Sequence, residues 1–456
     1  MTESRPLSPG DGVTATLAHF LVASRWEDVP AAARHEAKRT LLNCLGAALG
    51  GCRDAAVEHA LAVLRRFAGP PEATVIGRTE RVDALTAAFV NAASANVLDF
   101  DDTHLPTVIH PAAPVIPAVL AIAERMPVSG AQLLHAAILG IEVECRVGNA
   151  VSPWHYARGW HITSTCGVIG AAAAVAKLLR LEAERTTWAL GIAANQACGL
   201  IETLGSMAKS VSVGNAPRNG IVAALLAQQG VTAAPQTLEG ARGFVHVMGD
   251  KPDLSAIDTA LGTSWESARN TYKPYPCGIV LHPMIDALLA LRAAHALRAD
   301  AVARVIVKGN PLLRQRTDRP APRTGREASV SAQHTAAVCL LYGAAGVAQY
   351  RDECVADPAV QALGARVAVE DDPAIPVGAA VVDVRTADGR SLAHSVAHAL
   401  GSLERPMSDA AIEAKVRDLA SVGAPDCEVD RLIDAVWTID RHDDAAIVAR
   451  LASARA

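Results

Sequence analysis

Lysine and aromatic residues are scarce in this 456-residue chain. Only seven lysines occur, Phe, Tyr and Trp together make up 4% of the residues, and the formal net charge is -5. Proteins that bind nucleic acids usually carry a basic stripe, often interleaved with aromatic side chains that stack on bases. This chain has no such stripe, so its sequence argues against a nucleic-acid partner.

Sequence motifs for zinc, nucleotides and membranes are also missing. The nine cysteines are scattered singly, without a CxxC pair or a Cys/His zinc spacing, and we expect them to be buried, reduced thiols. Neither GxGxxG after a strand nor GxxxxGK[ST] occurs, so no motif is available for a nucleotide cofactor. MTESRPLSPGDG is not a signal peptide and every apolar run is too short to span a bilayer, which predicts a cytoplasmic protein without membrane contact.

The hydrophobic pattern predicts a mainly α protein with two domains. From residue 12 to about residue 262, apolar residues recur at intervals of three and four, which is typical of successive helices. ARVIVKG, ARVAVED and AAVVDVRTADGRSLAHSV, between residues 303 and 396, are instead β-branched, and an Asp-Gly turn lies inside the last of them. We therefore predict an all-helical domain over 1–268 and a smaller α+β domain over 269–401, with helices in 402–456 that pack back on the first domain.

The stretch VLDFDDTHLPTVIHP, residues 97–111, places three carboxylates, two threonines and two histidines between two apolar helices. Helix capping and loop hydrogen bonds explain Asp99, Asp101 and Asp102 without any chemistry. An aspartate-rich metal motif is a weaker alternative, because such a motif would need another acid where Leu105 stands. The third alternative is acid/base catalysis, helped by the N-terminus of the next helix, which attracts anions.

Two further polar clusters follow in the helical region. WHYARGWHITSTCG, residues 154–167, contains His155, which we interpret as structural, and His161 in a predicted loop before a helix that begins near Cys166. ETLGSMAKSVSVGNAPRNG, residues 202–220, places Lys209 in a predicted loop bracketed by Gly205 and Gly214. Lys209 is either a solvated surface lysine or a clamp for a carboxylate.

A fourth cluster, YKPYPCGIVLHP at residues 272–283, lies near the predicted domain boundary and contains Lys273 and His282. Ligand sites are frequent at domain boundaries, which favours a role for these two side chains in binding. The alternative is a linker stiffened by its prolines.

Taken in order, these motifs resemble those of the MmgE/PrpD family, which includes 2-methylcitrate dehydratase, cis-aconitate decarboxylase and iminodisuccinate epimerase. The resemblance is carried by VLDFDDTH, HPAAPVIPA, GWHITSTCGVIGAAAAVAKLL, GSMAKSVSVGNAPRNG, KPYPCGIVLHPMIDA and RPAPRTGREASVSAQH. It implies a homodimer that needs no metal or organic cofactor and moves the proton α to a carboxylate of a small di- or tricarboxylate. It also implies catalytic roles for Asp99, Thr103, His110, His161 and Lys209 and a binding role for Lys273; we add His282 because of its position.

Two departures from the family pattern leave the reaction open. Ile162 stands where several members have proline, and Ser212 stands where others have histidine. We expect dehydration of a citrate-like hydroxy acid, with decarboxylation of the cis-aconitate type and epimerisation of the iminodisuccinate type as alternatives. A relative that binds a carboxylate without catalysis, or that acts as a scaffold, is the alternative from another class.

Overall fold

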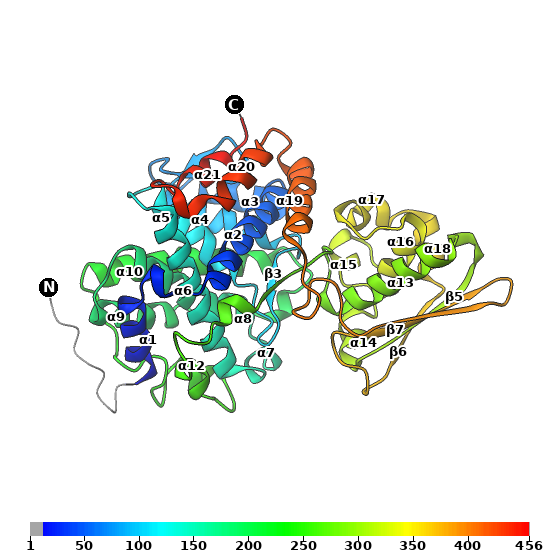
Figure 1. The fold of residues 1–456 in the computed structure, drawn as a ribbon, viewed down its shortest axis with the longest axis horizontal. Helices are drawn as coiled ribbons and strands as arrows, with labels where there is room; N and C mark the ends of the chain where they lie inside the picture. Colours follow the sequence, from blue (N-terminus) through cyan, green and yellow to red (C-terminus); the bar gives the residue numbers. More distant parts are fainter. Residues whose placement is uncertain (1–11, 456) are drawn as a thin grey trace. The chain divides into compact units, whose positions relative to one another are not determined.

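The computed structural model describes residues 12–455, which separate into two compact units. Within the described residues, unit 1 comprises 12–97, 101–270 and 409–455, and unit 2 comprises 98–100 and 271–408. Unit 1 is built mainly from helices, and unit 2 combines helices with a four-stranded sheet (Figure 1). The prediction of a mainly α fold with a smaller α+β domain is confirmed.

The helices of unit 1 lie in two parts of the chain, before and after the main segment of unit 2. They are α1 (Val13–Ala23), α2 (Ala31–Gly51), α3 (Ala55–Leu64), α4 (Ala84–Asn96), α5 (Ala112–Ala123), α6 (Gly130–Val151), α7 (Trp154–Ala157), α8 (Ile162–Leu178), α9 (Ala183–Ala194), α10 (Ala208–Gln228), α11 (Phe244–Met248), α12 (Ser255–Asp258), α19 (Asp409–Gly423), α20 (Val429–Trp437) and α21 (Ile447–Leu451). The strands β1 (Ala73–Thr74), β2 (Arg81–Val82) and β3 (Asp102–His104) are short, and β1 pairs with β2.

Small residues allow these helices to pack closely around α8, which is buried on nearly all sides. A Cβ added at Gly140 of α6 would lie 2.7 Å from the carbonyl oxygen of Gly170 in α8. A Cβ added at Gly220 of α10 would lie 2.6 Å from the Cβ of Ala171 in α8. Since real side chains do not tolerate such distances, the glycine and alanine content of the sequence determines how closely these helices approach.

Helix α10 corrects one expectation from the sequence. Lys209 and Gly214 were predicted in a loop, whereas α10 begins at Ala208 and continues through both residues. Gly214 is required by packing, because an added Cβ would lie 2.8 Å from the carbonyl oxygen of Phe89 in α4. Its place in the sequence resembles a helix stop, but its function is a close contact between helices.

The C-terminal region returns to unit 1. Helix α19 packs along α2, where an added Cβ at Gly46 would lie 2.5 Å from a methyl group of Val416. The buried Lys415 of α19 donates a 2.7 Å hydrogen bond to Asn43 of α2. Residues far apart in the sequence thus complete one helical core.

Unit 2 contains the sheet β6-β5-β7-β8, formed by β5 (Val302–Gly309), β6 (Val367–Asp371), β7 (Ala380–Thr386) and β8 (Ser391–Val396). Strand β5 is parallel to β6 and antiparallel to β7, and β7 and β8 form the predicted hairpin with Gly389 at φ +90° in its turn. The other elements are β4 (Asn270–Tyr272), α13 (His282–His295), α14 (Pro311–Thr317), α15 (Gly325–Ala328), α16 (Ala332–Tyr342), α17 (Asp352–Val355) and α18 (Pro358–Gly364). Helix α13 packs on β7 and β8 and α16 packs on β6 (Figure 1). Apolar residues of these helices and of the sheet share one core.

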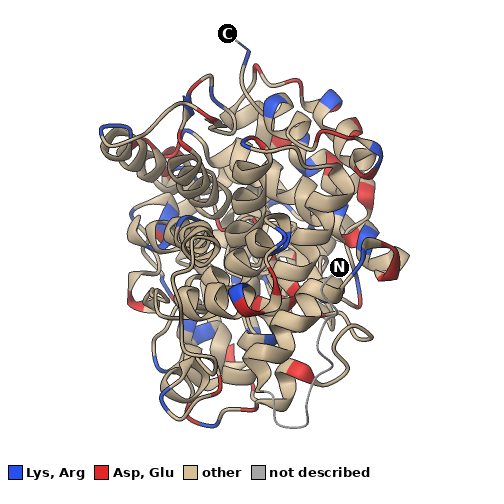
Figure 2. Cartoon of the chain, turned by 90° about the vertical axis from the view of Figure 1, so that its left-hand side faces the viewer, with Lys and Arg blue, Asp and Glu red and all other residues tan. Residues whose placement is uncertain are grey.

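The cysteines and the surface test two of the compositional expectations. Six cysteines are buried, but Cys198 is exposed, so the prediction of buried thiols is wrong at that position. Acidic and basic residues are interspersed on the face of the molecule seen in Figure 2. No helix in residues 12–455 is long and apolar enough to cross a membrane.

A buried ion pair in helix α6 holds the segment that follows α12, residues 259–267, against that helix. The Arg146 guanidinium donates a 2.6 Å hydrogen bond to Glu142 and also donates to the carbonyl oxygens of Thr259 and Ser264, while Glu142 accepts from the Ser267 amide. Both charged side chains are almost completely buried. Removing one partner would leave the other charge without compensation in the interior.

We therefore expect Arg146→Met to lower the free energy of unfolding by about 3 kcal/mol or more, as measured by urea denaturation. The matched control is Arg25→Met, because the Arg25–Asp28 pair is mostly exposed to solvent and should have no measurable effect on stability. Equal losses of stability in the two variants would contradict the structural importance of the Arg146 contacts.

Candidate active site

The polar stretch at residues 97–111 connects the end of α4 to the start of α5 and includes β3. The backbone of Asp99 has φ +52°, an uncommon conformation for a residue other than glycine, and Asp101, Asp102 and Thr103 are buried. The chain therefore turns sharply after α4 and places polar side chains inside the protein, where they need hydrogen-bond partners.

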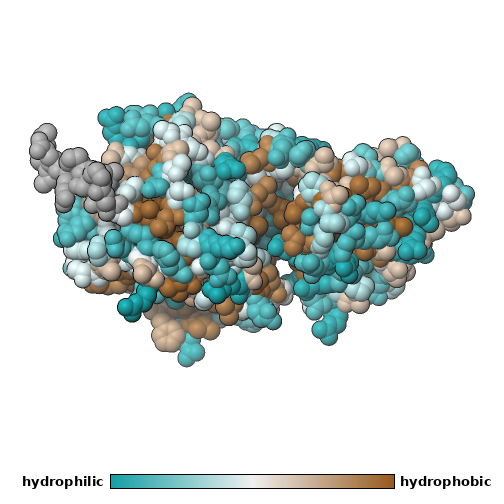
Figure 3. Space-filling model, turned by 90° about the horizontal axis from the view of Figure 1, so that it is seen from below, coloured by the Kyte–Doolittle hydropathy of each residue, from teal (hydrophilic) through white to brown (hydrophobic). Residues whose placement is uncertain are grey.

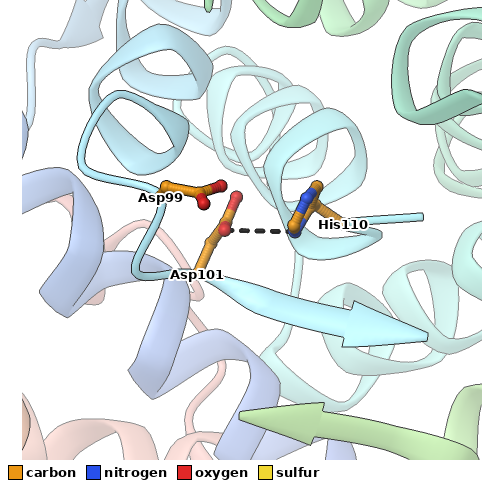
Figure 4. Close-up of side chains that lie close together, drawn as sticks. All are labelled: Asp99, Asp101 and His110. Atoms are coloured by element: carbon orange, nitrogen blue, oxygen red, sulfur yellow. Dashed lines mark ion pairs between the residues drawn. The ribbon is translucent and has the colours of Figure 1, made fainter. Parts of the chain in front are cut away.

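His110 is held through one nitrogen of its ring. Its Nδ1 lies 2.6 Å from the carbonyl oxygen of Asp102, 3.1 Å from Oδ1 of Asp101 (Figure 4) and 3.4 Å from Oγ1 of Thr103. A carbonyl oxygen only accepts hydrogen bonds, so Nδ1 carries the hydrogen and the neutral ring has its lone pair on Nε2.

Asp101 and Asp102 are themselves fixed by neighbouring amides. Asp101 accepts a 2.7 Å hydrogen bond from Asn96 at the end of α4. Asp102 accepts from the backbone amide of Ala112 at 3.0 Å and from the side chain of Asn270 at 2.6 Å. Burial, with the nearby Asp101 charge as the second cause, raises the pKa of Asp102 to about 6.

The contact with Ala112 bears on the expectation that the helix after His110 binds an anion. The Ala112 amide at the start of α5 is already bonded to the Asp102 carboxylate, so the protein supplies an acid of its own at this position. The capping interpretation of the aspartates is therefore correct for Asp102.

His161 occupies the N-cap position of α8, which begins at Ile162 rather than near Cys166. Its Nδ1 lies 2.9 Å from Oγ of Ser164 and 3.3 Å from Oγ of Ser212, and its backbone amide donates to the Gly199 carbonyl at 3.0 Å. Two residues further on, Thr163 accepts a 3.1 Å hydrogen bond from the His110 amide. The structure thus joins the segments that carry His110 and His161.

Lys209 lies in the first turn of α10, and its backbone carbonyl accepts a 2.8 Å hydrogen bond from Ser212. Ser210, in the same turn, contacts Asn96 and so connects α10 to the residues that hold Asp101. In the segment before α10, Leu200, Leu204 and Met207 are exposed to solvent. Hydrophobic and hydrophilic residues are mixed over the face of the molecule seen in Figure 3. The predicted residues Thr103, His110, His161 and Lys209 are all connected within unit 1.

The remaining predicted residues belong to unit 2. The Lys273 ammonium is buried, lies 3.1 Å from the Asp99 carboxylate and donates to the Asp99 carbonyl oxygen at 3.1 Å. His282 begins α13, is also buried, and meets the ring of Tyr275 edge to face at 5.5 Å. The Asp99–Lys273 ion pair is a contact that the sequence analysis did not predict.

Two other histidines of these motifs have structural contacts on both ring nitrogens. His104 contacts Thr107 and Glu266, and its hydrogen bond lowers the pKa of Glu266 to about 2. His155 contacts Thr165 and the Met248 carbonyl, and burial lowers its pKa to about 4. The structural interpretation of His155 agrees with these contacts.

The residues around His110 are also of the types that bind divalent metals. Asp99, Asp101 and His110, the side chains labelled in Figure 4, form a group that could provide carboxylate and imidazole ligands. Asp101 and His110 also lie within ion-pair distance of each other, 3.1 Å between Oδ1 and Nδ1. Metal independence stays a prediction.

The sequence analysis gave no catalytic role to Asp101, Asn96, Ser164 or Ser212. Asp101 was visible as one acid among three, but the sequence contains no signal for which of them contacts His110. Ser212 was noted only as a missing histidine, although its hydroxyl lies beside His161. Only the packing of α10 against α4 and α8 places it there.

The fold and these contacts define a two-domain, mainly α protein with two histidines held through Nδ1, of which His161 is buried and His110 is partly exposed. Comparison with protein families agrees with that architecture: residues 15–257 match the MmgE/PrpD N-terminal domain and residues 275–439 match the MmgE/PrpD C-terminal domain. The chain belongs to the MmgE/PrpD family.

Several known proteins are similar over nearly the whole chain. A cis-aconitate decarboxylase of Aspergillus terreus (strain NIH 2624 / FGSC A1156) is 28% identical, covering 95% of this chain and 94% of its own length. The cis-aconitate decarboxylases of Mus musculus and Homo sapiens are each 28% identical, covering 91% of this chain and 88% and 89% of their own lengths.

The raised pKa of Asp102 predicts how its substitution will affect stability. Because the carboxyl group binds its proton more tightly in the folded chain, its contribution to stability is present at about pH 4 and is lost as the pH rises through about 6. Asp102→Asn keeps an oxygen for the Ala112 and Asn270 amides but does not titrate. The stability of the variant relative to the wild type should therefore rise by about 2 kcal/mol between pH 4 and pH 7.

Urea denaturation at a series of pH values measures this difference. The exposed Asp258→Asn is the control and should show a constant difference from the wild type. A constant difference for Asp102→Asn as well would show that this carboxyl group titrates normally.

Proposed function

We propose that this chain is a lyase that acts on a small di- or tricarboxylate and transfers a proton at a carbon next to a carboxylate, without an organic cofactor or metal. The observation that supports the proposal is the pair of histidines in unit 1, each contacted at Nδ1 and connected through the His110–Thr163 hydrogen bond. Proton transfer by positioned imidazoles is effective near neutral pH. Family membership and the names of the relatives support the same class of reaction.

Decarboxylation of an unsaturated tricarboxylate of the cis-aconitate type is the reaction that the relatives favour. The bond between carbon and the departing carboxylate breaks, CO₂ leaves, and the electron pair stays on carbon, delocalised towards a neighbouring carboxylate. A protonated imidazole then gives one proton to that carbon. His161 and His110 are the candidate donors, because each ring is held through Nδ1, and the Lys209 ammonium suits a carboxylate of the substrate.

This proposal differs from the dehydration that the sequence favoured. Dehydration would need a base for the α proton and an acid for the departing hydroxyl, and both histidines and Thr103 are chemically suitable. Epimerisation would need groups on both faces of one carbon. These reactions are the alternative outcomes of a substrate test, and the homodimer and the binding roles of Lys273 and His282 remain predictions.

The substrate test uses the full chain with cis-aconitate, citrate, 2-methylcitrate and iminodisuccinate in D₂O, followed by proton NMR. We expect cis-aconitate to be consumed, with one mole of CO₂ released and one solvent deuteron placed on carbon for each turnover. Turnover of citrate or 2-methylcitrate to an unsaturated acid would identify a dehydratase instead. Binding of a carboxylate with neither turnover nor deuterium exchange would support the alternative without catalysis.

The same assay tests the proposed independence from metal. Activity should survive dialysis against EDTA, with untreated enzyme as the control. Loss of activity that Mg²⁺ or Fe²⁺ restores would assign Asp99, Asp101 and His110 to a metal site.

Substitution of His161 and Lys209 should produce different kinetic defects. His161→Ala should reduce kcat by about 10²- to 10⁴-fold with KM largely kept, because a group for proton transfer is lost. Lys209→Ala should chiefly raise KM, because a cation for a substrate carboxylate is lost, and kcat also falls if the ammonium favours the transition state. Steady-state kinetics and melting temperatures measure both effects.

Exposed residues provide the controls for these substitutions. His59→Ala and Lys251→Ala change the same residue types away from the site and should leave both constants unchanged. Near-normal kcat in His161→Ala would assign the proton transfer to His110 or His282.

A further inference from the structure

A chain of hydrogen bonds leads from the ring of His161 to a backbone carbonyl. Nδ1 of His161 lies 2.9 Å from Oγ of Ser164, which lies 2.9 Å from Oγ of Ser212. The Ser212 hydroxyl in turn donates to the carbonyl oxygen of Lys209 at 2.8 Å. Two side-chain hydroxyls therefore stand between the imidazole and a group that only accepts.

The end of this chain determines the direction of every hydrogen bond in it. A serine hydroxyl has one hydrogen, and that of Ser212 is used by the Lys209 carbonyl. Ser212 must then accept from Ser164, and Ser164, with its hydrogen used, must accept from His161. Because Ser164 can only accept in its contact with His161, Nδ1 of His161 must carry a hydrogen.

We propose that Ser164 and Ser212 are positioning residues that hold neutral His161 in the tautomer with hydrogen on Nδ1 and the lone pair on Nε2. The effect on turnover rests on the function proposed above, but the tautomer does not. With this tautomer, His161 and His110 both carry hydrogen on Nδ1 and both react through Nε2.

The two histidines nevertheless differ in the groups that contact Nδ1. Nδ1 of His110 lies 3.1 Å from the Asp101 carboxylate, whereas Nδ1 of His161 contacts the hydroxyls of Ser164 and Ser212. The hydroxyl chain ends at a carbonyl oxygen, which does not take up a proton at neutral pH. It therefore orients the ring and does not carry protons away from it.

Local packing holds the hydroxyls in place. Gly199, at φ +133°, accepts the His161 backbone amide, and an added Cβ there would lie 2.9 Å from the Cβ of Ser164 and 3.3 Å from that of His161. Ser212 lies three residues after Lys209 on α10, so its hydroxyl reaches the Lys209 carbonyl within the same helix. The chain thereby connects the backbone at Lys209 to the ring of His161.

The test is the tautomer of His161 in full-length protein labelled with ¹⁵N-histidine, read at about pH 8.5 from long-range proton–nitrogen NMR spectra. The His161 signals are assigned by their loss in His161→Gln. In the wild type we expect hydrogen on Nδ1. Ser164→Ala removes the acceptor and Ser212→Ala frees the Ser164 hydroxyl to donate, so both should shift the population towards hydrogen on Nε2.

Kinetics provide a second readout that a merely structural role would not change selectively. Each serine-to-alanine variant should reduce kcat by about 3- to 10-fold, the usual effect of one hydrogen bond, with KM nearly unchanged. Ser212→Thr keeps a hydroxyl and should restore both the tautomer and kcat. The control is Ser94→Ala, which removes a buried serine whose hydroxyl also donates to a carbonyl in its own helix, that of Val90 in α4.

The proposal is overturned if wild-type His161 carries its hydrogen on Nε2, or if the tautomer is unchanged in both alanine variants. It is also overturned if Ser212→Thr behaves like Ser212→Ala. Failure of the proposed function is a separate result, because it appears as wild-type protein that turns over none of the carboxylates while the tautomer can still be read.

Discussion

The buried carboxylate of Asp102 is the contact on which the geometry around His110 depends. It accepts hydrogen bonds from the first amide of α5 and from the side chain of Asn270, which is distant in sequence. The carbonyl of the same residue accepts from Nδ1 of His110. One residue therefore fixes both the start of α5 and the orientation of the imidazole that precedes it.

Burying the Asp102 carboxylate in this way is energetically unfavourable. A charged carboxylate without water is unfavourable, which is why burial raises the pKa of Asp102 to about 6, and two amide donors only partly offset this cost. Perturbed carboxyl groups of this kind are frequent at functional sites, although structural networks also produce them. The carbonyl of Asp102 contacts His110, so the residue with this unfavourably buried carboxylate also holds a side chain suited to proton transfer.

Close helix packing supplies the rigidity that such chemistry requires. Alanine and glycine bring α4, α6, α8 and α10 so near one another that side chains on different helices meet within hydrogen-bond distance. Hydroxyls and amides on these helices then bridge the segments that carry His110, His161 and Lys209. Small residues thus serve the site indirectly, because they allow polar groups to converge in a core that otherwise excludes water.

The sequence alone determined the mainly α class, the β-branched strands of the smaller unit and the family, because periodicity, turn residues and long motifs are local properties of the chain. It also indicated His110, His161, Lys209 and Lys273 as chemically important. It did not determine that α10 begins before Lys209, since Gly214 resembles a loop residue until its contact with α4 is seen. Only the tertiary structure decided that Asp101 pairs with His110, Asp99 with Lys273 and Ser212 with His161, because each contact depends on the angle at which separate segments of the chain meet.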